Sequence, residues 1–357
     1  MAEEVLDRRA LNRALLARQL LLERRPLGAL DAIEAVGGMQ AQAPRAPYVG
    51  LWSRIEGFDP GALEALVREG EVVRTWLMRA TVHLVSARDA RAWGRSFAEV
   101  RRRRWTASAF AKLLDERDVA EAAEAVAELV AQAPRTRAEL RHALRERLPG
   151  RDAEALGYVA AYHCFVAQAP PRGLWTEGGP AKLAPLEVDR GDGAAAEEVL
   201  RRGLAAIGPA TPADLATWSG MSGVAAALER LGDDVVALSD DRGRTLFDLR
   251  DAPRPPGDTP APPRFLPEYD NTLLSHADRA RVIDVERRVP LPPGNGGTAG
   301  TLLVDGFWRA EWKLDREGVL RIARFAPWPR EHDDAVTTEA AALTAFLQGK
   351  DHDLSDA

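Results

Sequence analysis

The chain has 357 residues, of which 46% are hydrophobic, and carries a formal net charge of −6. This length suits two to four small domains, and the apolar content allows folding without covalent or metal cross-links. The single cysteine, Cys164, excludes a disulfide framework and a cysteine-based zinc site, and no uncharged apolar run is long enough to cross a membrane. We therefore expect a cytoplasmic protein with no membrane partner. Its acidic balance argues against one that coats nucleic acid non-specifically, but allows a local basic surface.

The first part of the chain is predicted to form helices followed by a pair of strands. Leucines and other apolar residues recur at helical spacing, and Gly37-Gly38 is a typical helix end. Residues 72–85 are rich in β-branched and aromatic side chains, which predicts two strands. Helices are expected over residues 4–24, 27–36, 48–55 and 60–69. Helices followed by a β-ribbon are the order of elements in a winged helix.

This order recurs twice further along the chain. Helices are predicted over residues 86–104, 117–131, 137–147 and 152–167, followed by a Pro/Gly-rich hairpin at 169–185. Thr136 and Glu139 have the spacing of a capping box at the start of one of these helices. Thr211-Pro212 is a strong start signal for a helix pair at 213–219 and 222–231, and strands at 235–238 and 245–249 come next.

The last part of the chain changes to strand periodicity after a Pro-rich spacer at 251–263. Strands are predicted over residues 281–285, 301–304, 307–314 and 319–325, with a loop at 290–300, a helix at 333–348 and a disordered tail at 351–357. The predicted fold is α+β, mostly α, with three tandem winged-helix units and a C-terminal β-domain. The predicted domains are 1–115, which includes the candidate site and linker helices, 116–192, 193–252 and 264–350.

The best candidate for a site is the loop from Gly37 to Pro44, which holds Gln40 and Gln42 two residues apart after a helix end. Taken alone, this pair has a plain structural interpretation, in which both amides hydrogen-bond a turn. The chain shows no phosphate-binding P-loop, no dinucleotide-binding glycine motif and no complete set of metal ligands.

Three stretches resemble the winged-helix DNA glycosylases related to AlkZ and YcaQ: Gly38 to Gln42, Met78 to Val85, and Leu266 to Arg279. The resemblance extends over nearly the whole chain. It implies three winged helices and a C-terminal β-domain around a concave DNA-binding surface. It also implies removal of alkylated purines, including bulky adducts and, in some members, unhooking of interstrand crosslinks. One position departs from the pattern, because Ala80 stands where a glycine is expected.

The resemblance makes Gln40 and Gln42 the expected catalytic residues, in the two-glutamine form of the family's signature. A glutamine cannot take up a proton, so it cannot serve as an ordinary general base. A purine alkylated at N7 or N3 is already cationic and leaves as a neutral base. Two carboxamide oxygens can then place a water and stabilise a sugar cation by orientation and dipole.

Contacts to the DNA backbone are expected from Arg45, Arg54 and Arg79, with His83 as a further candidate that could instead be a packed core histidine. The expected partner is double-stranded DNA containing alkylated purines. We expect a monomer without metal or cofactor, associated with the nucleoid when bound to DNA. Two alternatives stay open, namely a winged-helix regulator that binds DNA without catalysis, and a lesion-binding or self-resistance protein that shields DNA.

Overall fold

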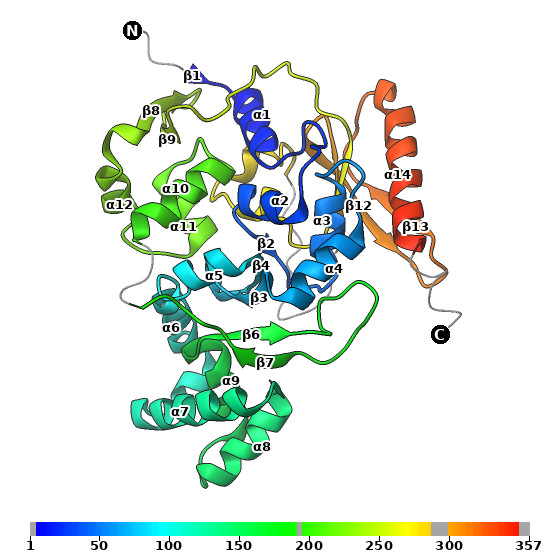
Figure 1. Ribbon diagram of the computed structural model, residues 1–357. Coiled ribbons are helices and arrows are strands. Elements are labelled where there is room, and N and C mark those ends of the chain that lie inside the picture. The colour runs from blue at the N-terminus through cyan, green and yellow to red at the C-terminus, as the bar shows by residue number, and fades with distance from the viewer. Residues whose placement is uncertain (1–4, 191–194, 287–298, 350–357) are drawn as a thin grey trace.

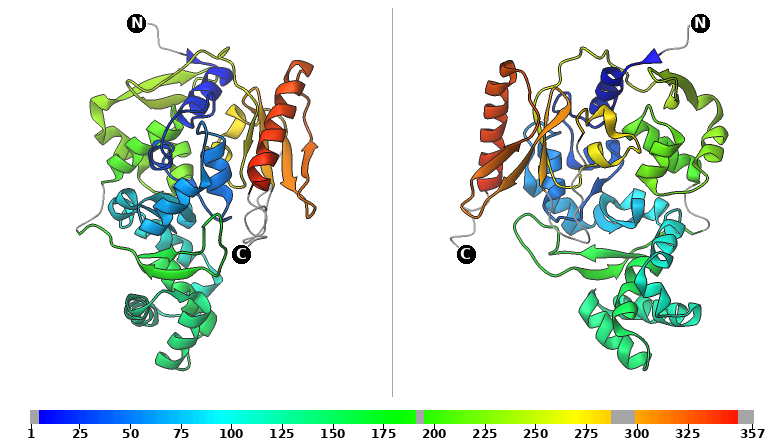
Figure 2. Two further views of the ribbon diagram at one scale, coloured as in Figure 1. Left: turned by 45° about the vertical axis from the view of Figure 1, so that its right-hand side comes forward. Right: turned by 180° about the vertical axis from the view of Figure 1, so that it is seen from behind.

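Three sheets, with helices packed around them, make up the α+β fold of the computed structural model, which describes residues 5–190, 195–286 and 299–349 (Figure 1). Figure 2 shows the helices α7 (Glu116–Gln132), α8 (Arg137–Arg147) and α9 (Ala153–His163) at the end of the molecule opposite the N-terminus. None of the described helices is both long and apolar enough to span a membrane.

The first part of the chain forms helices and the predicted strand pair around the glutamine loop, but the helix predicted at 4–24 spans only Arg8–Arg18, and Val5–Leu6 form a strand. Its strands and short helix are β1 (Val5–Leu6), β2 (Met39–Gln40), β3 (Val72–Trp76), η1 (Met78–Ala80) and β4 (Val82–Ser86). Its helices are α1 (Arg8–Arg18), α2 (Ala29–Ala35), α3 (Ala46–Trp52), α4 (Pro60–Glu69), α5 (Ala87–Trp93) and α6 (Ala98–Thr106). The segment predicted as one helix at 86–104 is thus two helices, α5 and α6.

The second part begins as the sequence predicts. Thr136 accepts from the Glu139 backbone at 3.1 Å and the Glu139 carboxylate accepts from the Thr136 backbone at 2.7 Å, so both halves of the capping box of α8 form. Strands β5 (Arg135–Thr136), β6 (Val166–Ala169) and β7 (Lys182–Pro185) complete this part.

The hairpins of the first and second parts join in one six-stranded sheet, in the order β2-β4-β3-β6-β7-β5. Strand β3 pairs with β4 on one side and with β6 on the other, through Arg74 opposite Gln168 and Thr75 opposite Ala167. The short strand β2, which ends on Gln40, is at the edge of this sheet, beside β4. The sheet therefore ties the helices α7 to α9 to the same framework as the glutamine loop.

The third part consists of α10 (Ala196–Ile207), α11 (Pro212–Ser219), α12 (Val224–Arg230) and the hairpin β8 (Val235–Asp240) and β9 (Thr245–Leu249). Thr211 caps α11 in a capping box with Asp214, and Pro212 occupies the first turn, as the sequence predicts. Strand β1 adds to this hairpin in parallel with β8. The N-terminal strand is therefore part of a sheet about 230 residues away in sequence, a pairing with no local signal.

The C-terminal part is a four-stranded sheet, ordered β10-β11-β12-β13, covered by one helix. Its elements are β10 (Arg264–Leu266), α13 (Asn271–Leu274), β11 (Gly300–Val304), β12 (Phe307–Leu314), β13 (Leu320–Arg324) and α14 (Asp333–Gln348). Figure 2 shows α14 lying along this sheet, where Val336 and Leu343 pack against Phe265 and Leu302.

The strand predicted at 281–285 is wrong. Asp278 instead caps a single helical turn, η4 (Arg279–Arg281), and β10 takes the place beside β11. The predicted tail at 351–357 and most of the loop at 290–300 lie outside the described residues.

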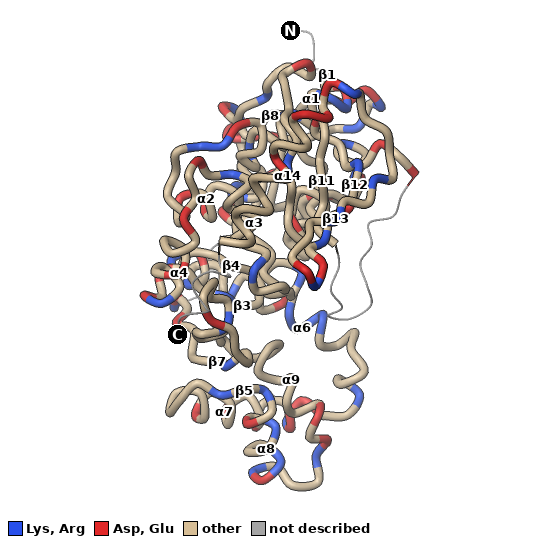
Figure 3. The backbone as a smooth tube through the Cα atoms, turned by 90° about the vertical axis from the view of Figure 1, so that its right-hand side faces the viewer, with Lys and Arg blue, Asp and Glu red and all other residues tan. Residues whose placement is uncertain are grey.

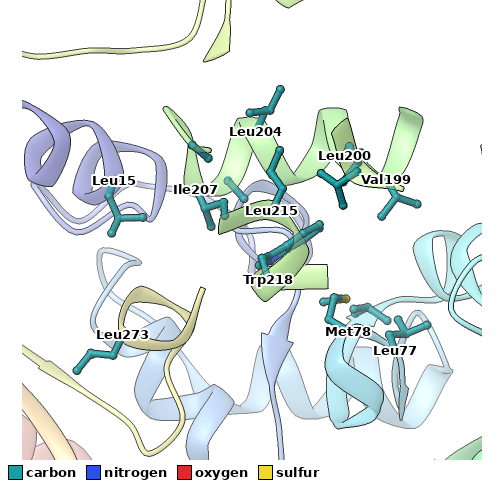
Figure 4. Close-up of a cluster of buried hydrophobic side chains, with 14 of the residues drawn as sticks. Leu15, Leu77, Met78, Val199, Leu200, Leu204, Ile207, Leu215, Trp218 and Leu273 are labelled. Atoms are coloured by element: carbon teal, nitrogen blue, oxygen red, sulfur yellow. The ribbon is translucent and has the colours of Figure 1, made fainter. Parts of the chain in front are cut away.

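The largest apolar cluster brings the first, third and C-terminal parts together (Figure 4). Trp218 of α11 is fully buried at its centre, near Met78 of η1 and Leu204 of α10, and Leu15 of α1 and Leu273 of α13 belong to the same cluster. Burying one such large side chain stabilises the fold by roughly 2–3 kcal/mol. This packing fixes η1 against α11 and α13, the elements that supply the contacts described next.

Candidate active site

The glutamine loop begins where α2 ends. Gly37 and Gly38 adopt φ values of 73° and 83°, which a residue with a side chain rarely takes. A Cβ on Gly38 would stand 2.7 Å from Val85, so the close approach to β4 also requires glycine. The chain then enters β2, where Gln40 lies opposite His83 of β4. Two glycines thus lead the chain into β2, an edge strand that lies near the centre of the molecule (Figure 1).

The two glutamines are held by different donors. Gln40 is 8% exposed, and its carboxamide oxygen accepts from Arg79 Nη2 at 2.9 Å. Gln42 is partly exposed, and its oxygen accepts from the Val82 backbone at 3.2 Å. Ala41 between them is fully buried, and its carbonyl accepts from Arg74 at 2.7 Å. Gln40 is the last residue of β2, and Gln42 lies two residues beyond the end of that strand.

Arg79 connects the site to two other parts of the chain. Its Nη1 donates to the Trp218 carbonyl at 2.7 Å, and its Nη2 donates to Gln40 and, at 3.0 Å, to Asn271 Oδ1. Burial lowers the pKa of Arg79 to about 10, with repulsion from Arg279 as the second cause, so it stays protonated near neutral pH. The guanidinium therefore faces neutral acceptors and fixes the side chain of Gln40.

Arg79 and Ala80 both have positive φ, at 56° and 55°. Such values cost a non-glycine residue about 1–3 kcal/mol and are often found at functional sites. At position 80, where the family pattern is expected to have glycine, this chain therefore places an alanine in a conformation that glycine adopts freely.

His83 is fully buried beneath this turn. Its Nδ1 lies 3.0 Å from the Thr81 carbonyl, which can only accept, so Nδ1 carries the hydrogen and Nε2 accepts from Arg79 at 3.2 Å. Burial and the neighbouring Arg79 lower the pKa of His83 to about 3. The imidazole is therefore neutral at physiological pH, and both of its nitrogens are engaged.

The two other predicted arginines occupy contrasting places. Arg45 is exposed, with its guanidinium carbon 5.8 Å from the centroid of the Trp175 ring. Arg54 is 1% exposed, pairs with Asp270 at 3.0 Å and donates to the Gln19 carbonyl at 2.9 Å. A side chain so enclosed cannot reach a phosphate in this conformation, so the structure disfavours Arg54 as a DNA contact.

Sequence reasoning missed Asn271 and Asp270 as parts of the site. Asn271 accepts from Arg79 and donates to the Gly38 carbonyl at 3.0 Å, so one amide bridges the arginine and the glutamine loop. Asp270 caps α13 and holds Arg54. These residues, with Gln19, Met39 and Gln40, border a small cavity with room for about one water molecule. Their only signal was their place in the run Leu266 to Arg279.

Comparisons with known proteins identify the family and the fold of the chain. The model of the family described as "DNA glycosylase AlkZ-like" matches residues 33–346. Among solved structures, the chain is similar to the DNA glycosylase AlkZ of Streptomyces sahachiroi, with a TM-score of 0.75, 22% sequence identity and 97% of each chain covered. At that identity the likeness shows a common fold. No curated protein sequence matches the chain at a significant level. Because the family model covers most of its length, the chain belongs to the AlkZ-like family of DNA glycosylases.

Proposed function

We propose that this protein is a monofunctional DNA glycosylase that hydrolyses the N-glycosidic bond of cationic N7- or N3-alkylated purines, including bulky adducts and interstrand crosslinks. The observation that carries the proposal is that both carboxamides accept from the same part of the chain, Gln40 from Arg79 of η1 and Gln42 from the Val82 backbone of β4. In this role the two carboxamides orient the attacking water and stabilise positive charge on the sugar.

The groups around Gln40 support the restriction to charged lesions. A neutral leaving base would need a proton from the protein. His83 is neutral with both nitrogens engaged, and Arg79 holds its proton to well above neutral pH. Neither group can protonate a departing base. The lesion's own charge must then activate the leaving group.

We further propose different roles for the two remaining arginines. The Nη atoms of Arg79 donate to Trp218, Gln40, Asn271 and His83, which favours anchoring of Gln40 over contact with a phosphate. Arg45 is exposed beside the glutamine loop, which suits a backbone contact to DNA. Guanidinium groups match phosphate oxygens well in geometry and charge.

We also propose that the chain has the domains predicted from its sequence. Residues 1–115, 116–192 and 193–252 are proposed as three winged helices, with 264–350 as the β-domain, because each of the first three contains helices followed by a hairpin. The proposed partner is double-stranded DNA containing alkylated purines. We propose that the protein acts as a monomer on the nucleoid.

The direct test is incubation of the protein with a duplex containing N7-methylguanine, followed by alkali to cleave any abasic sites. Strand breaks at the lesion are the expected result. Tight binding to the duplex without strand breaks would instead support a non-catalytic DNA-binding or lesion-shielding protein.

A further inference from the structure

A second cavity, of about 320 Å³, lies between α6 and the end of α9, away from the glutamine loop. Three arginines and three rings line it: Arg95, Arg101, Arg102, Tyr162, His163 and Phe165. The described lining contains no carboxylate. Figure 3 shows basic residues on α6, the helix that supplies two of the three arginines.

Arg101 is the deepest of these arginines, with 4% of its surface exposed. Its Nη1 donates to the Cys164 carbonyl at the end of α9, and its guanidinium carbon lies 4.9 Å from the centroid of Phe165. Within the described parts of the chain, its buried Nε has no acceptor. The partial negative charge of the α9 terminus compensates the guanidinium only in part. Burying a guanidinium without a full counter-charge costs several kcal/mol, so an anion in the cavity would be stabilising.

The remaining lining residues leave this positive charge uncompensated. Arg95 donates to the Asp189 carbonyl at 2.8 Å, and its guanidinium carbon lies 5.4 Å from the Phe165 centroid. Arg102 pairs at 2.9 Å with Glu99, a surface residue outside the lining. Burial lowers the pKa of His163 to about 4, with Arg101 as the second cause, so the imidazole adds no charge near neutral pH.

We propose that this cavity binds a backbone phosphate of DNA, as a contact additional to those at the glutamine loop. Arginine forks bind phosphate oxygens in pairs, and aromatic faces accept the sugar or base of the same nucleotide. The inference rests on the proposed function only in taking the partner to be DNA. A carboxylate of a partner protein would neutralise the charge of the arginines, but it would leave the aromatic rings of the cavity without a binding partner.

Helix α6 links the cavity to the turn that holds Gln40. Arg101 and Arg102 of α6 line the cavity, and the same helix packs against η1, which contains Arg79. One helix thus carries arginines of the cavity and a contact to the neighbourhood of the glutamine loop.

The test compares the parent with the double variant Arg95→Gln/Arg102→Gln, which leaves the buried Arg101 in place. The control is Arg104→Gln, an exposed arginine on α6 outside the cavity. Affinity for an undamaged 24-base-pair duplex is measured at several salt concentrations. We expect the slope of log affinity against log salt to fall by about 0.9 for each lost contact in the double variant and to stay unchanged in the control.

Two further measurements separate the alternatives. If the three proteins share one slope, the proposal is overturned. If inorganic phosphate raises the melting temperature of the parent but not of the double variant, while DNA slopes stay equal, the cavity binds free phosphate and the DNA proposal is overturned. Excision of N7-methylguanine is measured separately. If the double variant has a reduced salt slope but none of the three proteins excises N7-methylguanine, the phosphate site is retained and the glycosylase proposal is rejected.

Discussion

Gln42 is the residue at which the proposed chemistry is most directly tested. Gln42→Ala should lower the single-turnover excision of N7-methylguanine by about a hundredfold or more, because an oriented dipole stabilises the transition state. Affinity for the same duplex should stay within a few-fold, since the water matters little to ground-state binding. Gln132→Ala, an exposed glutamine at the end of α7, is the matched control. Equal excision rates in both variants would remove Gln42 from the mechanism.

Arg79 separates an anchoring role from a phosphate contact. A lysine cannot reproduce the contacts that Arg79 makes with Gln40, Asn271 and Trp218. Arg79→Lys should therefore lower the single-turnover rate by about a hundredfold, the effect of misplacing a catalytic group by about 1 Å, and leave the salt slope of binding unchanged.

Arg45→Gln provides the comparison, because it should flatten the salt slope by roughly 0.9 and spare the rate at saturating DNA. If Arg79→Lys flattens the salt slope and leaves the rate at saturating DNA unchanged, then Arg79 contacts a phosphate.

Arg54 is expected to matter for stability. Arg54→Met leaves the Asp270 carboxylate buried without its partner, which should destabilise the protein by about 3–5 kcal/mol in chemical denaturation. Adding Asp270→Asn should recover part of that loss, since the uncompensated charge disappears. A loss below about 1 kcal/mol for Arg54→Met would mean that this pair contributes little to the fold.

At the scale of elements, the turn η1 carries strain that can be relieved. Ala80→Gly removes the cost of a positive φ but also loses a buried methyl group and makes the unfolded chain more flexible. We expect a net change in stability within about 1 kcal/mol and unchanged excision. Ala80→Val should be clearly destabilising, because a β-branched residue fits that conformation poorly. Equal melting temperatures for the two variants would contradict the strained geometry.

Local signals predicted those elements whose ends are set by their own residues. Helices α4 and α14, the capping box of α8 and the Thr211-Pro212 start of α11 agree with the sequence, because Pro, Thr and acidic residues fix helix starts locally. The strand expected at 281–285 failed, because the alternation there was outweighed by Asp278, which caps a turn. The pairing of β3 with β6 joins residues that are far apart in sequence, and no local pattern specifies it.

Only some features of the site could be predicted from the sequence. The glutamines could be found because a helix end and two glycines precede them. Asn271 could not be found in this way, because its role depends on a hydrogen bond to Arg79, which is 192 positions away in sequence. Its uncharged amide also gives no charge pattern in the sequence. The burial of Arg54 likewise depends on Asp270, 216 positions along the chain.

At the scale of the whole molecule, the proposal predicts a limited substrate range. Cationic N7- or N3-alkylpurines should be excised, whereas uracil and 8-oxoguanine should not, because no group at Gln40 can donate a proton to the departing base. Single-turnover rates on N7-methylguanine, 1,N6-ethenoadenine and uracil duplexes provide the comparison. Comparable rates on all three would require an acid–base pair elsewhere and would contradict the proposed roles of Gln40 and Gln42.

The contacts of Arg79 also bear on when activity arises during synthesis. Gln40 lies in the first eighth of the chain, but the partners that fix it include Trp218 and Asn271, which leave the ribosome much later. Early in translation the partners that hold Arg79 are missing, so on the proposed mechanism an unfinished chain should excise alkylated bases poorly. A fragment ending before residue 271 should share that defect. On the proposed mechanism, excision activity therefore arises only once the C-terminal part of the chain is present.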